Sequence, residues 1–284
     1  MNGVKKRTKG RGKMLRQMAL PERDVSAATL EVDGKRAFIL AKNGSRVSLI
    51  TKENGQMIKS NLWNNYRDAF APFISRVGDR IAVFAAKGNT PVLRPIGEKG
   101  GIILRSPYLK RARVSGRALE FKGRALVPAL GVPYGCKFSS AVVFASEDAG
   151  NSWYLLSLVL IAEDFGYPVV NFRIARKGNE LIGLVETLPL RTVHITRSRD
   201  GESWSKPRFA GIIGANSIPL VVKDELFIMC SSGRHINLYR QEKLFKRIEM
   251  EKAVKHLDAF CSRERITAVV TLEDGEGRLI EFEI

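Results

Sequence analysis

The amino-acid sequence predicts an all-β fold, a six-bladed β-propeller with four-stranded antiparallel blades. The first observation is a repeat: an apolar strand, a tight polar turn and a second apolar strand recur six times along the 284 residues. Successive turns are 44, 45, 55, 46 and 40 residues apart, which is the usual length of one propeller blade. The turns lie at Gly34, Gly78, Gly123, Gly178, Asp224 and Glu264.

The second observation is the composition of these repeats. Asp-Gly, Gly-Asp and Lys-Gly pairs between apolar runs are hairpin signals, because glycine accepts a positive φ. Runs such as "RIAVFAA" and "ELFIMC" are almost continuously apolar, as expected for strands that are buried on both faces between stacked blades. Helical periodicity is weak, and the best helix candidate is the short segment 249–256.

The repeats divide a propeller domain, residues 17–284, into its blades. In chain order we expect blades at roughly 25–65, 66–106, 107–162, 163–212, 213–252 and 253–284. The last unit ends at its third strand, so we expect residues 13–20 to supply the missing outer strand and to remove an exposed edge. Residues 1–16 contain seven basic and no acidic residues, which predicts a basic, disordered tail.

The net charge of +18 limits the kinds of partner that the chain can have. A basic tail and body suit nucleic acid or an acidic partner surface. A basic body equally suits an anionic small ligand such as an acidic sugar, and the tail alternatively serves only solubility. The composition therefore favours an anionic partner without choosing its class.

Other classes of protein are disfavoured by what the sequence lacks. No apolar run approaches the length of a membrane-spanning helix. The N-terminus has no apolar secretory segment, which predicts a cytoplasmic protein unless a signal preceded residue 1. Three widely spaced cysteines and three isolated histidines argue against a disulfide framework and against a zinc site. We expect a monomer without metal or cofactor.

Two short segments repeat a polar motif, "SEDAGNSW" at 146–153 and "SRDGESW" at 198–204. In such a turn the Asp carboxylate accepts backbone N–H groups, glycine supplies the positive φ, and tryptophan fills the gap between neighbouring sheets. The motif therefore predicts a fold-stabilising turn and no catalytic group. Its structural residues are Ser146, Asp148, Gly150, Trp153, Ser198, Asp200, Gly201 and Trp204.

The first segment matches the Asp-box, Ser-x-Asp-x-Gly-x-Ser/Thr-Trp, at every defined position, and the second matches it with one residue deleted. Asp-boxes (BNR repeats) are typical of sialidase-like six-bladed β-propellers, so the chain resembles the neuraminidase superfamily over roughly residues 20–284. The resemblance places the boxes between third and fourth strands, on the face opposite the ligand site. It implies a ligand site made by the segments 63–70, 106–113, 131–137, 162–168, 187–191, 231–235 and 254–260.

The resemblance also indicates candidate ligand-binding residues. Sialidases use three arginines on the substrate carboxylate, for which the guanidinium fork is well suited. Arg191 and Arg234 lie in positions similar to the family's second and third arginines. Arg173, in "NFRIAR", resembles the first arginine's motif but lies in the fourth unit and not in the first. Tyr167 and His235 are further candidates from the predicted ligand face.

The catalytic set of the family is incomplete in this chain. The first inner strand has no arginine, and no tyrosine precedes the last inner strand, where the family has its nucleophile. Asp68 lies in the region of the family's acid/base. A carboxylate pair such as Asp68 and Glu163 could serve hydrolysis in a divergent site.

Three functional hypotheses follow from the sequence. The first is a sialidase-like propeller that binds a glycan or other anionic ligand on its loop face, without complete catalytic machinery. The second is a divergent glycoside hydrolase of the same fold, similar to an exo-sialidase. The third is an interaction scaffold that contacts nucleic acid or an acidic partner through its basic tail and body.

Overall fold

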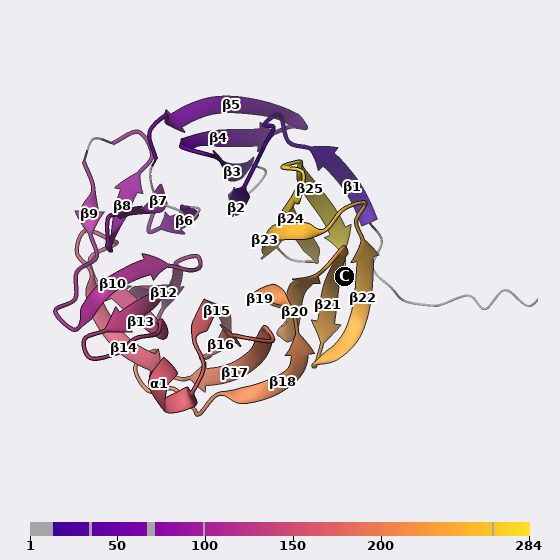
Figure 1. The fold of residues 1–284 in the computed structure, drawn as a ribbon. Coiled ribbons are helices and arrows are strands. Elements are labelled where there is room, and N and C mark those ends of the chain that lie inside the picture. Colours follow the sequence, from indigo (N-terminus) through magenta and orange to yellow (C-terminus); the bar gives the residue numbers. More distant parts are fainter. Residues whose placement is uncertain (1–13, 34–35, 67–71, 99, 263) are drawn as a thin grey trace, which may run out of the picture.

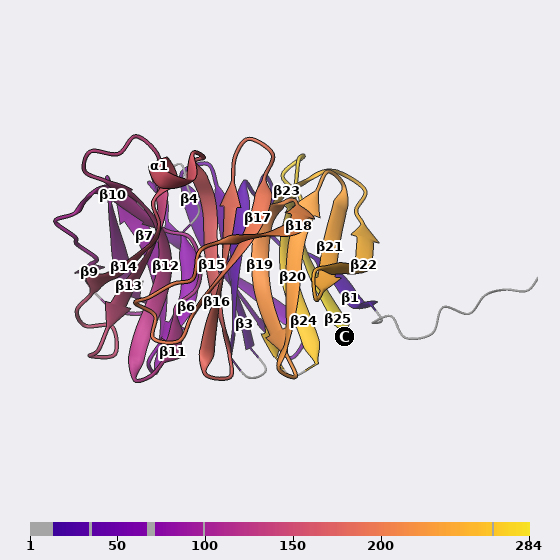
Figure 2. The same cartoon turned by 90° about the horizontal axis from the view of Figure 1, so that it is seen from below.

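The computed structural model confirms the predicted fold class, an all-β propeller of six antiparallel blades (Figure 1). The structure describes residues 14–33, 36–66, 72–98, 100–262 and 264–284. The six sheets surround one axis, and their strands run between the two faces of a disc (Figure 2). The part of the tail before residue 14 lies outside the described residues.

The first three blades follow the chain order. Blade 1 contains β2 (Ala27–Asp33), β3 (Arg36–Asn43), β4 (Arg46–Glu53) and β5 (Gln56–Trp63). Blade 2 contains β6 (Phe73–Val77), β7 (Arg80–Lys87), β8 (Thr90–Pro95) and β9 (Ile102–Ile103). Blade 3 contains β10 (Leu109–Val114), β11 (Leu119–Phe121), β12 (Arg124–Pro133), β13 (Ser140–Ser146) and β14 (Tyr154–Leu160).

The remaining blades complete the ring. Blade 4 contains β15 (Val169–Lys177), β16 (Glu180–Thr187), β17 (Thr192–Ser198) and β18 (Arg208–Ile213). Blade 5 contains β19 (Ala215–Val222), β20 (Glu225–Ser232), β21 (His235–Arg240) and β22 (Lys243–Glu249). Blade 6 contains β23 (Val254–Ser262), β24 (Arg265–Leu272), β25 (Gly277–Glu283) and the N-terminal β1 (Met14–Ala19).

Blade 6 joins the two ends of the described chain. β1 pairs antiparallel with β25, from Met14 opposite Phe282 to Ala19 opposite Arg278. This pairing covers the outer edge of β25, which would otherwise expose unpaired backbone groups. The pair Lys52–Glu281 also links blade 1 to blade 6.

Hydrophobic side chains fill the spaces between blades. Each of the six buried clusters found in the described part of the chain joins one pair of neighbouring blades. β12 and β13 are buried along almost their whole length, as their continuous apolar sequences predict. The core is therefore divided into layers between sheets, and the axis is left to polar side chains.

The inner strand of blade 3 differs from the regular pattern because it is divided into β10 and β11. Pro128 in the neighbouring β12 has no N–H group for the ladder, and Ser115 N–H donates to its carbonyl at 3.0 Å. At Gly116 a Cβ atom would lie 2.8 Å from the Pro128 ring and 2.9 Å from Arg173 Cδ. Glycine thus lets the chain bulge towards the axis and carries Arg117 there.

The helix candidate at 249–256 is wrong. β22 ends at Glu249 and β23 begins at Val254, so the segment is a turn followed by an inner strand. In the described residues the α-helix is α1 (Ala162–Phe165), a single turn that ends at Gly166 with φ 81°. In the turn Glu251 and Lys252 are exposed, whereas Met250 is buried in the core between blades 5 and 6.

Candidate functional site

The two faces of the disc carry different connections. The face that bears α1, here called the α1 face, is formed by loops between blades and between second and third strands (Figure 2). The opposite face, here called the Asp-box face, carries the other hairpins. The described parts of all the segments predicted for the ligand site belong to the α1 face or to inner strands that start there.

Asp258 lies at the centre of the ring. This fully buried residue on β23 accepts hydrogen bonds from Arg173 Nη1 at 2.7 Å and from Arg117 Nη2 at 2.8 Å. Leu30 N–H on β2 donates to the same carboxylate at 2.8 Å. We call Asp258, Arg117 and Arg173 the central cluster. Because blades 3 and 6 lie opposite each other, the contact between Arg117 and Asp258 spans the axis.

The central cluster sets one carboxylate against two guanidinium groups, and the buried carboxyl group of Glu31 on β2 lies near Arg117. Burial alone would raise the pKa of Asp258, but the two guanidinium groups outweigh burial and hold that pKa at about 2. Arg173 is only 5% exposed and lies over the Phe73 ring at 4.7 Å. Both arginines therefore already have a buried counterion, and the Nε groups of Arg117 and Arg173 are engaged by the Leu30 carbonyl and by Asn171.

A second polar network connects the central cluster to the α1 face. Buried Glu186 accepts a hydrogen bond from Arg191 Nη1 at 2.7 Å, and its other oxygen accepts from Ser217 N–H at 3.2 Å and from Asn171 Nδ2 at 3.4 Å. Asn171 Oδ1 in turn accepts from Arg173 Nε at 3.4 Å. Two of the predicted ligand-binding arginines, Arg173 and Arg191, therefore belong to one hydrogen-bonded network.

The other predicted ligand-binding residues lie outside this network. Arg234 turns towards the outer strand, where its Nη2 donates to Glu249 at 2.9 Å. His235 begins β21 beside it. Tyr167 lies beyond α1 with half of its surface exposed. The structure thus groups Arg191 with Arg173, and leaves Arg234, His235 and Tyr167 apart from them.

The two predicted catalytic carboxylates are not seen together. Asp68 lies outside the described residues. Glu163 on α1 accepts the backbone N–H groups of Lys137 at 2.5 Å and Phe138 at 2.9 Å. These bonds lower its pKa, whereas a general acid needs a raised one. Glu163 therefore fixes the loop 137–138 against α1.

Two buried polar atoms lie near the inner edge of blade 6 without a partner in the described chain, His256 Nδ1 and Thr271 Oγ1. The two residues face each other in the register of β23 and β24. Burial, and then the charge of Arg173, lower the pKa of His256 to about 4, so the ring is neutral at neutral pH. Unsatisfied buried groups of this kind are satisfied in other proteins by ordered water.

The Asp-box segments form closed turns on the face opposite α1. Asp148 accepts bonds from Ser146 Oγ at 2.8 Å, Ser152 N–H at 2.8 Å and Ser152 Oγ at 2.6 Å. Trp153 of blade 3 contacts Phe84 of blade 2 edge to face at 5.7 Å between ring centroids. These contacts stabilise turns and join neighbouring blades.

The second segment repeats this arrangement between blades 4 and 3. Asp200 accepts bonds from Ser198 Oγ at 3.0 Å and from Ser203 N–H at 2.8 Å. Gly201 has φ 85°, and its carbonyl accepts a bond from Trp204 Nε1 at 3.0 Å. In the described part of the chain, the groups that donate hydrogen bonds to the two Asp carboxylates belong to their own turns.

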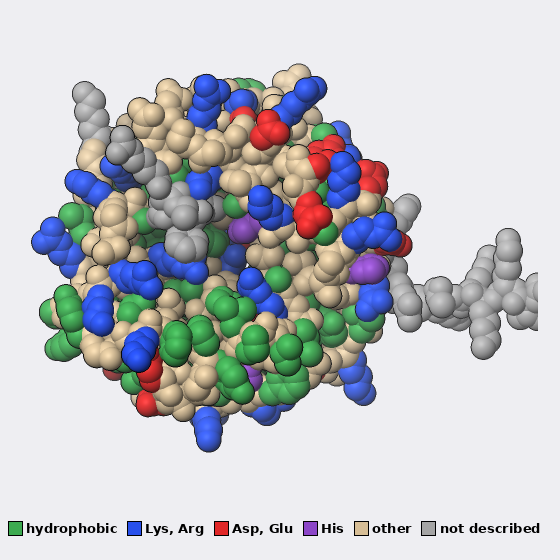
Figure 3. Space-filling model, in the orientation of Figure 1, with side chains coloured by type: hydrophobic (Ala, Val, Ile, Leu, Met, Phe, Trp, Pro, Cys, Tyr) green, Lys and Arg blue, Asp and Glu red, His purple; other side chains and the backbone are tan. Residues whose placement is uncertain are grey.

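Sequence reasoning missed the basic and aromatic side chains of blade 3 on the α1 face, although it included the segments that carry them. Tyr108 and Tyr134 are 67% and 64% exposed, and Tyr134 N–H donates to the Tyr108 carbonyl at 3.1 Å. Arg105, Lys110 and Arg111 lie within three residues of Tyr108 in the chain, and Figure 3 shows Lys and Arg side chains over blade 3. The side chains of Arg105, Arg111 and Lys137 have no hydrogen-bond or ion-pair partner in the part of the chain that the structure describes.

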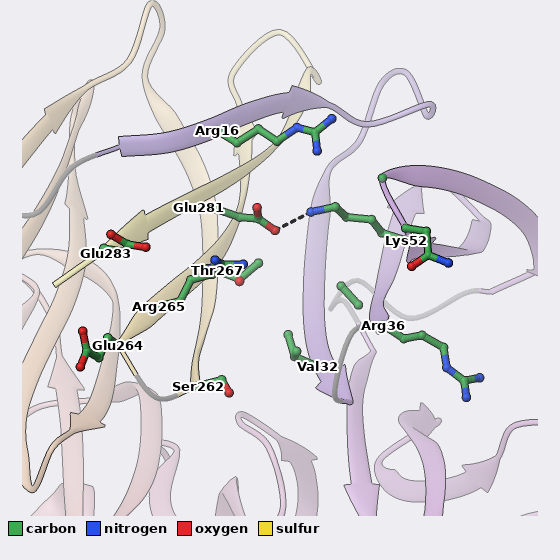
Figure 4. Close-up of a pocket in the computed structure, with 13 residues that line it drawn as sticks. Arg16, Val32, Arg36, Lys52, Ser262, Glu264, Arg265, Thr267, Glu281 and Glu283 are labelled. Carbon is green, nitrogen blue, oxygen red and sulfur yellow. Dashed lines mark hydrogen bonds and ion pairs between the residues drawn. The ribbon is translucent and has the colours of Figure 1, made fainter.

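A cleft of 860 Å³ lies at the Asp-box end of the seam between blades 1 and 6. Figure 4 shows the Lys52–Glu281 pair reaching across it, with Arg16 on the β1 side and Arg265 on the wall of blade 6. Its lining holds four basic and three acidic side chains, so no strong charge of one sign gathers there. The cleft lies where β1 closes the ring against β25.

Known proteins resemble the chain in fold and not in sequence. No family model matches the chain, and no curated protein matches it. Solved structures, in contrast, match the chain in fold. Trypanosoma rangeli sialidase superposes with a TM-score of 0.66 at 9% identity, covering 92% of this chain and 55% of the sialidase. The fold is the sialidase-like six-bladed propeller. The chain spans about half the length of this relative.

Two further neighbours are closer to this chain in length. The Fusarium graminearum α-L-arabinofuranosidase, in complex with arabinobiose, superposes with a TM-score of 0.64 at 9% identity, covering 90% of this chain and 92% of the enzyme. A gluconolactonase from Xanthomonas campestris gives 0.59 at 11% identity, with 86% and 82% covered. These likenesses establish the architecture alone. Among the described residues, none forms a helix long and apolar enough to cross a membrane.

Proposed function

We propose that the protein is a ligand-binding propeller that holds a glycan or related anionic ligand on its α1 face, without the hydrolytic chemistry of sialidases. One observation carries the proposal. Asp258 is the buried counterion of both arginines of the central cluster, while basic side chains without partners in the described chain lie on the loops of blade 3. We therefore place the ligand on the loops of blade 3 and not at the axis.

The central network does not support hydrolysis. Within the described chain, the hydrogen-bond and ion-pair partners of Asp258, Arg173 and Glu186 include no tyrosine. The lowered pKa of Glu163 opposes its use as a proton donor. A retaining or inverting glycosidase needs two carboxyl groups that act on one bond. A divergent active site would have to be completed by Asp68.

The blade 3 loops offer the features that an anionic ligand requires. Residues 105–113 and 133–139 contain five basic and no acidic residues. Exposed aromatic side chains lie among them, and aromatic groups beside a few charged ones are typical of small-molecule sites. The arabinofuranosidase complex with arabinobiose favours carbohydrate as the ligand class for a propeller of this shape.

Binding and hydrolysis can be tested separately. The full chain, incubated with a fluorogenic sialoside, is expected to release no fluorophore. An acidic oligosaccharide should bind with an affinity that falls as salt is added, because exposed charges are screened. The variant R111A/K137A should weaken binding about tenfold, while the charge-matched control R199A/K206A on the Asp-box face should change it less than about twofold.

The results distinguish the three functional classes. Release of sialic acid would establish the divergent hydrolase instead. Tighter binding to a single-stranded oligonucleotide than to the acidic oligosaccharide, lost on removal of residues 1–16, would establish the scaffold. Equal losses in R111A/K137A and in R199A/K206A would mean that the net charge of the protein, and not the α1 face, attracts the ligand.

A further inference from the structure

A strip of exposed apolar side chains crosses the α1 face over blades 3 and 4. It runs from blade 3 over α1 to the end of blade 4, and Figure 3 shows hydrophobic side chains gathered along this part of the face. Contiguous exposed apolar surface on a single chain commonly marks a binding site. We call this surface the apolar strip, and its members are Tyr108, Tyr134, Phe138, Tyr167, Leu190 and Ile213.

The loops that carry the apolar strip are joined to one another in order. Tyr134 N–H binds the Tyr108 carbonyl, as described above. Glu163 fixes loop 137–138 to α1 through its two short hydrogen bonds. Two further backbone bonds, Leu188 N–H to the Pro168 carbonyl at 3.1 Å and Gly214 N–H to the Arg191 carbonyl at 3.0 Å, continue the series to blade 4. The strip is therefore preorganised, which lowers the entropy cost of binding.

The aromatic members are mainly tyrosines with unused hydroxyl groups. Tyr108, Tyr134 and Tyr167 are between 50% and 67% exposed, and none of their hydroxyls has a partner in the described chain. A tyrosine offers an apolar ring face and a polar tip. A sugar ring has the matching pair of features, an apolar C–H face and a rim of hydroxyl groups.

The charges along the apolar strip change from one end to the other. The blade 3 end is cationic, with Arg105, Lys110 and Arg111 next to Tyr108. The middle is acidic, because Glu163 and Asp164 are exposed on α1. A strand of nucleic acid carries a phosphate at every residue and would meet repulsion at α1. An oligosaccharide with acidic and neutral units can place its acid at blade 3 and its hydroxyls at α1.

From this juxtaposition we propose that the apolar strip binds an extended acidic oligosaccharide. A uronic-acid unit lies at Tyr108 and Tyr134 beside the basic side chains, and neutral units continue over Tyr167 towards Leu190. The proposal rests on the proposed function and adds the position, the length and the direction of the ligand. The central cluster does not contact it.

The experiment uses the full chain and a hexasaccharide that has a uronic acid at one end and neutral hexoses in the other positions, followed by calorimetric titration. Tyr134→Ala and Tyr167→Ala should each weaken binding about tenfold, whereas Tyr134→Phe should stay within about threefold because the ring face remains. The matched control is Tyr154→Ala, an exposed tyrosine on the Asp-box face. The carboxyl-reduced hexasaccharide, tested on the unaltered protein, should bind more weakly than its acidic parent.

The outcomes separate this proposal from the proposed function. Loss of binding in R111A/K137A with unchanged binding in both Tyr→Ala variants would overturn the extended site and leave the proposed function standing. Failure of the protein to bind the acidic hexasaccharide at any salt concentration would overturn both. Equal weakening by Tyr154→Ala would also refute the strip, and unchanged unfolding midpoints would show that all variants are folded.

Discussion

Asp258→Asn gives the sharpest test of the central cluster. The substitution keeps the shape of the side chain but removes the charge that both arginines share. At separations of 2.7 and 2.8 Å, each ion pair has a gross attraction of about 6 kcal/mol at an effective dielectric constant of about 20. Most of this attraction is offset by the cost of burying the charges. Removal of one partner from a buried pair costs about 3–5 kcal/mol, because the other charge is left uncompensated.

We expect Asp258→Asn to lie at the upper end of this range, about 5 kcal/mol, since two guanidinium groups lose their counterion. Arg173→Met should cost less, because Asp258 keeps its contact with Arg117. Urea unfolding followed by tryptophan fluorescence measures both values. A change below about 1 kcal/mol for Asp258→Asn would refute the assignment of Asp258 as the counterion of the axis.

The same variant also tests where the ligand binds. Where Asp258→Asn is still folded, its affinity for the acidic hexasaccharide should stay within about threefold of the unaltered protein, because the partners of Asp258 in the described chain, Leu30, Arg117 and Arg173, are not members of the apolar strip. A large gain in affinity would mean that the freed arginines receive the ligand, and it would place the site on the axis.

Three further predictions concern the blades. Trp153→Ala should destabilise the fold by about 3–5 kcal/mol and Trp204→Ala by less, since Trp204 is more exposed; both are measured by urea unfolding. His256 has a pKa of about 4 in the folded protein, below its ordinary value of 6.5, so the fold is fully stabilised above pH 6.5 and weakens as the pH falls towards 4. The loss should reach about 2–3 kcal/mol in urea titrations at pH 7.5 and 4.5, and be absent from His256→Gln. Deletion of residues 1–20 should expose the edge of β25 and cause aggregation on size-exclusion chromatography, whereas deletion of residues 1–13 leaves β1 in place.

The parts of the fold that local sequence determines could be predicted. The blade period and the hairpins depend on alternating apolar runs and on turns with positive φ, as at Gly78 and Gly178. The segment 146–153 encodes its own closed turn within eight residues. α1 escaped prediction because a single turn has no periodicity, and its loop is fixed by Glu163 through bonds to residues 25 and 26 positions away.

The central cluster could not be predicted, because its residues are distant in sequence. Asp258 lies 141 residues from Arg117 and 85 residues from Arg173, and no local pattern relates them. Arg173 illustrates the difficulty. Its sequence resembles the motif of a ligand-binding arginine, yet its side chain is buried against Asp258 and Phe73. The bulge that brings Arg117 to the axis depends on Gly116 and Pro128, which a strand pattern does not identify.

The structure divides stability and binding between two parts of the molecule. Side chains from opposite blades meet at Asp258, so the axis resists opening of the ring. Exposed tyrosines lie on the loops, together with basic side chains such as Arg111 and Lys137 that have no partner in the described chain, and a change there costs little stability. Substitutions at the axis should therefore change the free energy of unfolding without changing the affinity for the oligosaccharide. Substitutions on the apolar strip should change this affinity without changing the free energy of unfolding. If one substitution changed both quantities strongly, ligand binding and ring closure would have to share residues, and the separation argued from the central cluster would fail.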